Sequence, residues 1–245
     1  ANRTLGRGGA LLIPAFAVGR AQAVLHLLSE LRRANRIPEV PIYLNSPMAV
    51  NATELFCTYL AEHKLSAEQC RQMCDGVRFV RTAAESMEVT PLGGPMIALS
   101  ASGMASGGRV LHHLERLAPD HRNTILFVGY QAAGTRGQAM LAGADRVKIF
   151  GSYVPVRAEV ASIDGLSAHA GRDELIAWLG RATTAPKAAY IVHGEPAAAD
   201  ALRRTLRDDL GWHTQVPEHG ETVELGAGHD NGHDRSATDA QAANR

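Results

Sequence analysis

Short apolar runs alternate with helical patterns along the first half of the chain. The first run, 10–15, precedes Gly19 and a helical repeat of apolar residues, namely Val24, Leu25, Leu27, Leu28 and Leu31. The same order recurs four times, which predicts strands at 10–15, 40–44, 77–80, 96–100 and 124–129, and further helices at 49–63, 69–75, 82–87, 110–117 and 138–142. Strands that alternate with helices through short loops favour right-handed βαβ units and an α/β fold with a mostly parallel sheet.

The pattern changes after Gly143. Apolar and polar residues then alternate over two short strands, as in a hairpin-like meander. Further elements are predicted as helix 172–181, strand 187–192, helix 196–210 and strand 222–225. We therefore expect one domain over 1–143 and a second over 144–225. The tail, 226–245, has almost nothing to bury and is expected to be disordered.

Composition narrows the class of protein. The chain has 245 residues, of which 45% are hydrophobic, and its 25 Lys and Arg balance 25 Asp and Glu. The chain has no net positive charge that would attract a polyanion, so any binding of nucleic acid must depend on a local positively charged surface. No apolar run reaches the length of about 18 residues that a membrane span needs, and the start lacks a hydrophobic signal core. We expect a cytoplasmic protein with no membrane partner, in which Cys57, Cys70 and Cys74 are reduced thiols rather than a metal site.

Candidate chemistry lies in two stretches, IDGLSAHAGRDEL (163–175) and YIVHGEP (190–196). Each places one histidine, His169 or His193, beside glycine where a strand would end and a loop would open. A lone histidine at such a place is more often a surface residue than a ligand. A helix and a strand separate the two stretches, however, and this return could bring both loops to one edge of a sheet. Three further polar residues lie close by in the sequence: Asp164, Ser167 and Glu195.

A glycine-rich loop, 102–108, admits two interpretations. Backbone amides around Ser102 and Gly103, with Arg109, could hold a phosphate. Tight turn geometry would demand the same glycines, and neither interpretation is favoured. The loop is neither a Walker motif nor Gly-x-Gly-x-x-Gly. Arg20 and Arg136, in loops at expected carboxyl ends of strands, could line the same groove, although a solvated helix surface is the alternative for each.

Six strings occur in an order that resembles the β-CASP branch of the metallo-β-lactamase superfamily, nucleases that act on RNA or DNA. They are IPAFAVGRAQ, YLNSPMA, SASGMASGGR, FVGYQAAGTRG, SAHAGRDEL and VHGE, and the resemblance covers most of 8–225. It implies that 1–143 is most of a parallel-sheet β-CASP cap domain and that 144–225 is the C-terminal part of a metallo-β-lactamase αββα domain. The family's His-x-His-x-Asp-His signature does not occur in these residues. We therefore expect a C-terminal portion, inactive alone, whose missing partner is an N-terminal metallo-β-lactamase half.

The resemblance also implies a chemistry. Two zinc ions in the complete enzyme would supply a hydroxide nucleophile for phosphodiester hydrolysis. His193 would be a zinc ligand, and His169 would contact the scissile phosphate and act as general acid. Ser167 would bind a phosphate oxygen, and Asp164 or Glu195 would orient a histidine ring. The expected function is RNA processing by endonucleolytic cleavage, with 5′-exonucleolytic cleavage as a second mode and a homodimer as a further assembly.

Other functions remain open at this stage. One is a non-catalytic β-CASP-like subunit that binds RNA or another protein, although retention of both His169 and His193 argues against it. Another is a nucleotide-binding α/β module that uses loop 102–108. A serine hydrolase is disfavoured because Gly165-x-Ser167-x-His169 lacks the final glycine of a nucleophile elbow.

Overall fold

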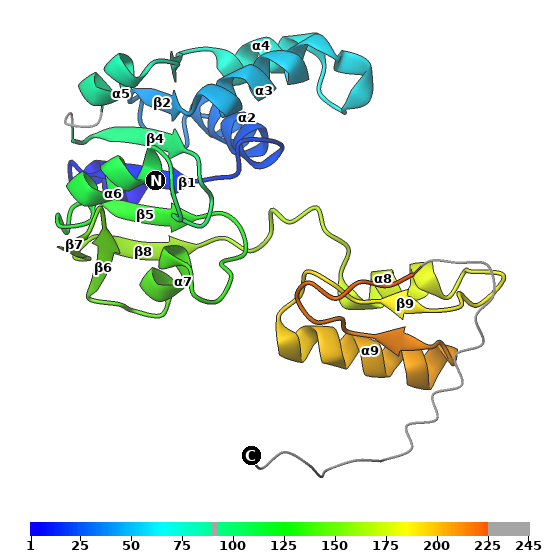
Figure 1. Ribbon diagram of the computed structural model, residues 1–245. Helices are drawn as coiled ribbons and strands as arrows, with labels where there is room; N and C mark the ends of the chain where they lie inside the picture. The colour runs from blue at the N-terminus through cyan, green and yellow to red at the C-terminus, as the bar shows by residue number, and fades with distance from the viewer. Residues whose placement is uncertain (90–92, 225–245) are drawn as a thin grey trace, which may run out of the picture. The chain divides into compact units, whose positions relative to one another are not determined.

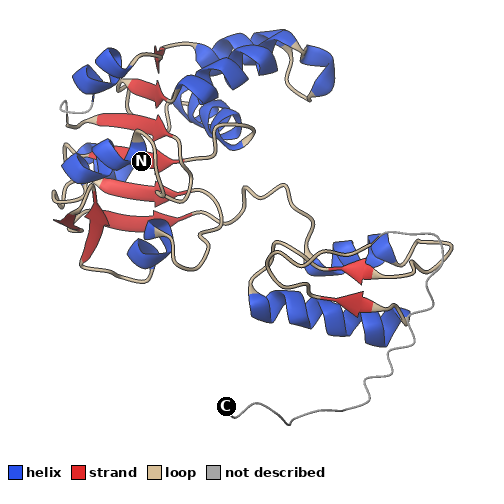
Figure 2. Cartoon of the chain, viewed as in Figure 1, coloured by secondary structure: helices blue, strands red, loops and turns tan. Residues whose placement is uncertain are grey.

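The computed structural model describes residues 1–89 and 93–224 and divides the chain into two compact units, Ala1–Gly171 and Arg172–Arg245. Figures 1 and 2 show the elements of each unit. The tail expected to be disordered, 226–245, lies outside the described residues. Within these residues, no helix combines the length and hydropathy that a membrane crossing requires.

The first unit is built on a six-stranded sheet in which every pairing is parallel, in the order β3-β2-β4-β1-β5-β8. The strands are β1 (Ala10–Pro14), β2 (Ile42–Asn45), β3 (Val77–Val80), β4 (Met96–Ser100), β5 (Thr124–Phe127) and β8 (Glu159–Ser162). β1 and β4 are buried along their whole length, as expected for strands covered on both faces. The predicted α/β class and parallel sheet are confirmed.

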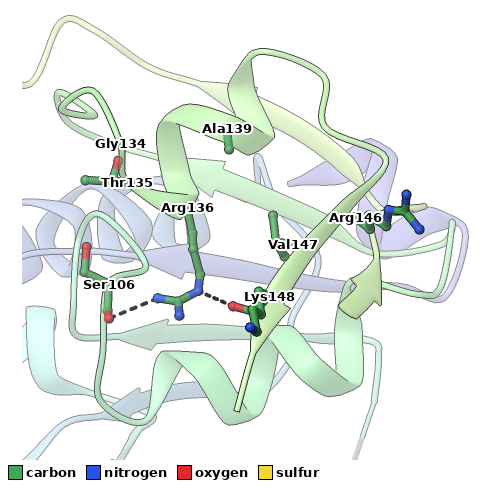
Figure 3. Close-up of a pocket in the computed structure, with 8 residues that line it drawn as sticks. All are labelled: Ser106, Gly134, Thr135, Arg136, Ala139, Arg146, Val147 and Lys148. Atoms are coloured by element: carbon green, nitrogen blue, oxygen red, sulfur yellow. Dashed lines mark hydrogen bonds between the residues drawn. The ribbon is translucent and has the colours of Figure 1, made fainter. Parts of the chain in front are cut away.

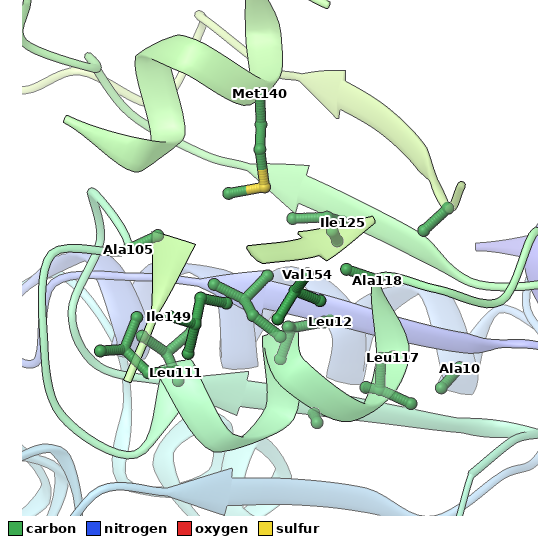
Figure 4. Close-up of a cluster of buried hydrophobic side chains, with 14 of the residues drawn as sticks. Ala10, Leu12, Ala105, Leu111, Leu117, Ala118, Ile125, Met140, Ile149 and Val154 are labelled. Atoms are coloured by element: carbon green, nitrogen blue, oxygen red, sulfur yellow. The ribbon is translucent and has the colours of Figure 1, made fainter. Parts of the chain in front are cut away.

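Helices cover both faces of this sheet (Figure 1). They are α1 (Asn2–Gly6), α2 (Arg20–Arg33), α3 (Pro47–Thr58), the short 3₁₀ helix η1 (Leu60–Glu62), α4 (Ala67–Cys74), α5 (Ala83–Val89), α6 (Val110–Leu117) and α7 (Arg136–Leu141). Side chains of β1 point alternately to two cores, since Leu12 packs with α6 and α7 whereas Leu11 and Ile13 pack with α2 and α3. Figure 4 shows the first of these cores. Leu27, expected to be buried, is 43% exposed because it lies beside the buried stripe of α2.

The predicted hairpin is present as β6 (Arg146–Ile149) and β7 (Ser152–Pro155), which pair antiparallel. Its Val147 and Val154 lie opposite each other and face the core. The chain then enters β8, which pairs with β5 along its whole length. For this reason the compact unit extends to Gly171, later in the chain than the division expected near Gly143.

The second unit contains α8 (Arg172–Leu179), β9 (Ala189–Tyr190), α9 (Pro196–Leu210) and β10 (Thr214–Gln215). β9 and β10 pair in parallel on either side of α9, so these three elements form a βαβ unit. The strand expected at 222–225 is wrong for Thr222–Glu224, which form no strand, and Leu225 lies outside the described residues. The chain pairs earlier because Gly211 ends α9 in a left-handed conformation (φ 67°) and returns it directly to β9.

Candidate functional site

The loops that carry most predicted site residues meet at one edge of the six-stranded sheet, because all six strands end there. Gln131 Nε2, in the loop after β5, donates to the carbonyl oxygen of Gly103, after β4, at 3.0 Å. A Cβ atom at Gly103 would lie 3.0 Å from Phe16, in the loop after β1. Ser102 and Gly103 therefore belong to a packed assembly of three loops, in which tight packing is one reason for the glycine.

Arg109 ends the glycine-rich loop, and its guanidinium turns into the protein. Nη1 donates to Asn45 Oδ1 at 3.1 Å and to the carbonyl oxygen of Val80 at 3.0 Å, and Nη2 donates to the carbonyl oxygen of Arg81 at 2.9 Å. These acceptors lie at the carboxyl ends of β2 and β3. Arg109 thus has a structural role in joining the loops, and its predicted contact with phosphate stays a prediction.

Behind this arginine lies a buried polar network that the sequence reasoning missed. Asn45 Nδ2 donates to Ser86 Oγ at 2.9 Å and lies 2.7 Å from His113 Nε2, while Ser100 Oγ donates to the carbonyl oxygen of Asn45 at 3.1 Å. Asn45 and His113 are both 0% exposed. His113 shares the apolar face of α6 with Val110 and Leu117, so the helical period alone could have indicated its burial.

His113 is held in its neutral form. Burial, and to a lesser extent the charge of His112, lowers the pKa of His113 from 6.5 to about 4. The amide of Asn45 can only donate to an unprotonated Nε2, which places the proton of the neutral ring on Nδ1. Nδ1 is buried and has no hydrogen-bond partner within the described part of the chain.

Arg136, the first residue of α7, also contacts backbone carbonyls. Nε donates to Lys148 at 2.5 Å, and Nη1 donates to Ser106 at 3.1 Å (Figure 3). It connects the glycine-rich loop to β6 and forms one wall of an open pocket of about 450 Å³. The lining residues are Ser106, Gly134, Thr135, Arg136, Ala139, Arg146, Val147 and Lys148.

Arg20 opens α2 at the same edge of the sheet. Its Nη1 is buried and makes no hydrogen bond to any described residue. Among the described residues nothing accepts from this nitrogen, whereas Nη1 and Nη2 of Arg109 both donate hydrogen bonds. A phosphate contact by Arg20 stays a prediction.

The loop after β8 presents the first predicted catalytic stretch. Leu166 is half-buried and packs against the core beneath the sheet, whereas Asp164, Ser167 and His169 are exposed. The backbone amide of His169 donates to Ser167 Oγ at 3.3 Å, which orients the hydroxyl and the histidine within one turn. This arrangement leaves the His169 ring accessible to a ligand.

The second predicted stretch lies between β9 and α9. His193 is exposed and has φ 66°, a left-handed conformation that is uncommon outside glycine and costs on the order of 1 kcal/mol or more. Glu195 is the residue before α9, and its carbonyl oxygen accepts from Ala199 N at 2.9 Å. Backbone strain of this kind occurs at ligand sites more than elsewhere, which supports the loop between β9 and α9 as a candidate ligand site.

The two histidines belong to different units, His169 to the first and His193 to the second. Their pairing across one site stays a prediction. No group of three or more His, Cys, Asp or Glu side chains in residues 1–89 and 93–224 is arranged to hold a metal ion. His193 fits one zinc ligand, but the described residues do not complete a zinc site.

The three cysteines are free thiols. Burial is the main cause that raises the pKa of Cys70 to about 11, and it also raises those of Cys57 and Cys74. A raised pKa disfavours the thiolate that binds metals or reacts with oxidants. The expectation of reduced thiols is consistent with this environment.

Two family matches follow one another along the chain. Residues 21–140 match the Beta-Casp domain, and residues 153–217 match the Zn-dependent metallo-hydrolase RNA specificity domain. The boundary expected near Gly143 falls between the two matched ranges. These ranges contain all the predicted site residues except Arg20.

Several curated relatives match most of this chain. Ribonuclease TTHA0252 of Thermus thermophilus is 39% identical over 212 residues, which cover 84% of this chain and 48% of the relative. Transcription termination factor FttA of Thermococcus kodakarensis is 35% identical over 236 residues, covering 91% of this chain and 36% of the relative. An RNase J-like protein of Methanocaldococcus jannaschii is 30% identical over 226 residues, covering 91% and 52%.

The chain thus spans about half or less of the length of the relatives that it matches. In TTHA0252 and FttA the match corresponds to the C-terminal portion. The resemblance seen in six ordered strings, the parallel sheet, and the two consecutive family matches all agree. This chain belongs to the β-CASP family.

Proposed function

We propose that this chain is the C-terminal portion of a zinc-dependent RNA-processing nuclease. The observation that carries the proposal is the consecutive match to a Beta-Casp domain and to an RNA specificity domain of Zn-dependent metallo-hydrolases. The exposed imidazoles of His169 and His193 support it, because both rings are accessible to a ligand. His169 lies in the SAHA loop (167–170) and His193 in the VHGE loop (192–195). The activity belongs to the complete enzyme, together with an N-terminal metallo-β-lactamase half.

His193 would contribute one neutral imidazole to a zinc site whose other ligands come from outside the described residues. Bound zinc would supply an activated water and stabilise negative charge on the phosphate. His193 lies in the short loop between β9 and α9, two residues before the N-cap residue Glu195, and its exposed ring suits this role. Glu195, two residues later, would orient the ring.

His169 would hold a proton close to the leaving oxygen of the scissile phosphodiester. An imidazole can donate that proton near neutral pH, which a serine hydroxyl cannot. Ser167 would donate a hydrogen bond to a phosphate oxygen, and its hydroxyl already lies against the His169 amide. Asp164, Ser102, Gly103, Arg20, Arg109 and Arg136 remain further proposed contacts around the substrate.

The test separates the two histidines in the intact enzyme. We expect His193→Ala to lower the zinc content, measured by elemental analysis, and to nearly abolish RNA cleavage. His169→Ala should retain zinc but lose cleavage rate, because it removes the general acid and no ligand. Exchange of the exposed His121 for alanine, on the turn before β5, is the control and should change neither quantity.

Full zinc content and normal turnover in His193→Ala would contradict the assignment. RNA binding without zinc-dependent cleavage in the unaltered enzyme would instead support a non-catalytic RNA-binding subunit. Binding of a free nucleotide at loop 102–108, without RNA cleavage, would support a nucleotide-binding module.

A further inference from the structure

The β6–β7 hairpin has one face in the core and one face in solvent. Val147 and Val154 form a directly opposed pair on the buried face. Lys148 and Tyr153 form the next opposed pair, and both are exposed. Because side chains alternate along a strand, Arg146 shares the outward face with Lys148.

Positive charge gathers on this face and in the pocket beside it. Arg136, Arg146 and Lys148 line the pocket, and none of its eight lining residues is acidic (Figure 3). Asp145 offsets part of this charge, since its Oδ1 lies 3.9 Å from Arg146 Nε. The Lys148 ammonium makes no ion pair with any described residue. In a chain with a net charge of zero, this is a local basic surface.

Two exposed aromatic rings accompany the charge. Tyr153 is 66% exposed, and the Arg146 guanidinium carbon lies 5.3 Å from the centre of its ring. Phe150, in the turn of the hairpin, is 54% exposed, and its ring centre lies 4.6 Å from that of His112. Packing in the core does not explain why this short hairpin carries two aromatic side chains, because both rings are more than half exposed.

We propose that the outward face of the β6–β7 hairpin, together with the adjoining basic pocket, binds single-stranded RNA outside the two histidine loops. Lys148 and Arg146 would contact backbone phosphates, and Tyr153 would stack on an unpaired base. This combination of basic groups and open rings is the one that single strands require, whereas duplexes keep their bases stacked internally. The inference rests on the proposed function, which makes RNA the substrate.

The test measures binding of the 245-residue chain to a short, unpaired, fluorescein-labelled RNA by anisotropy at several salt concentrations. We expect Tyr153→Ala to weaken binding by about tenfold through loss of stacking, while Tyr153→Phe retains the affinity. Lys148→Gln should lower the magnitude of the slope of log affinity against log salt by about 0.7, the value for one phosphate of a single strand. Lys64→Gln removes the same charge from the loop before α4, which packs on the opposite face of the sheet, and should bind as the unaltered chain does.

The possible outcomes distinguish this inference from the proposed function. If the unaltered chain binds RNA and both hairpin variants bind equally well, the hairpin is not a binding surface, and the nuclease proposal is unaffected. If the chain binds no unpaired RNA, the inference is wrong, and zinc content and cleavage of His193→Ala still decide the nuclease role. Equal binding of an RNA duplex, with no effect of Tyr153→Ala, would show a nonspecific basic surface and overturn the stacking contact. Circular dichroism of each variant checks that it is folded.

Discussion

His113 is fully buried on the inner face of α6, where its charged form is unfavourable. Its pKa of about 4 in the folded protein lies below the ordinary value of 6.5. Between these values the unfolded chain binds a proton that the folded chain does not, so stability falls as the pH is lowered from 6.5 to 4. The full effect is about 3 kcal/mol in the free energy of unfolding. The free energy of unfolding, measured by urea denaturation, should therefore be lower at pH 5 than at pH 7, and this difference should be most of the full effect.

The matched variant for this prediction is His113→Gln, because a glutamine amide oxygen can accept from Asn45 Nδ2 and does not titrate. The difference in stability between pH 7 and pH 5 should be smaller in this variant than in the unaltered protein. An identical difference would show that other groups, and not His113, cause the pH dependence. Exchange of the exposed His112 for glutamine should leave most of the difference in place.

Arg109 allows a structural role to be separated from a role in phosphate binding. Arg109→Ala leaves the carbonyls of Val80 and Arg81 without this donor, and we expect a loss of about 2 kcal/mol in the free energy of unfolding. Arg109→Lys keeps the charge, but its compact ammonium does not reproduce the planar guanidinium whose two nitrogens reach these acceptors, so it should lose most of the same stability. Arg116→Ala, on the exposed side of α6, is the control. Denaturation curves give these values.

RNA binding by the Arg109 variants tests the alternative. If Arg109→Ala weakens RNA binding and Arg109→Lys restores both the affinity and its salt dependence, the charge contacts phosphate directly. If both variants lose stability and neither changes the salt slope, Arg109 acts only by holding the ends of β2 and β3 together.

At the level of elements, β8 is the strand that leads into the SAHA loop, and it lies at an edge of the sheet. Its Glu159 is bound by Arg3 and by Arg7, whose Nη2 lies 3.0 Å from Glu159 Oε2. Glu159→Gln removes the charge from these contacts and should destabilise β8 by about 1 kcal/mol. We expect faster hydrogen–deuterium exchange over 159–162 and no change in the central strand β4. Glu68→Gln, which breaks a surface pair with Arg71, should leave exchange in β8 unaltered.

The strands buried on both faces could be predicted from the sequence because their apolar runs are continuous, as in β1 and β4. The position of β8 could not, because its pairing with β5 joins segments far apart in the sequence, and its burial is only partial. The expected strand at 222–225 failed for a related reason. The apolar residues at 222–225 resemble a strand, but the sequence alone does not show that the chain turns at Gly211 and pairs with β9 earlier, through β10.

In the candidate site, too, the sequence indicated which loops carry the site but not which contacts their side chains make. Histidines beside glycine at strand ends indicated the SAHA and VHGE loops, and both histidines are exposed. The direction of a long side chain was not predictable, since Arg109 and Arg136 turn toward backbone carbonyls that only the folded chain supplies. The central place of Asn45 in a buried network was not predictable either, because its partners Ser86 and His113 come from segments far along the chain.

At the level of the whole molecule, we expect the purified chain to show no nuclease activity even with added zinc. A catalytic zinc site needs about three protein ligands and an open position for water, and the described residues offer no such group. Incubation with labelled RNA, with zinc and with a chelator, measures this directly. Chelator-sensitive cleavage by the isolated chain that is lost in His193→Ala would show a complete site within these residues. Cleavage restored by co-expression with a β-CASP N-terminal half would support the shared site.

The common direction of the six strands also has a practical consequence for attaching probes. In the first unit, the loops that carry predicted site residues follow the carboxyl ends of the strands, so the connections that enter the amino ends lie at the opposite edge of the sheet. The turn between α2 and β2 is one such connection, and Asn35 and Arg36 are exposed there. A fluorophore or an affinity tag placed in this turn can report on the molecule, or immobilise it, without covering the loops at the carboxyl edge of the sheet.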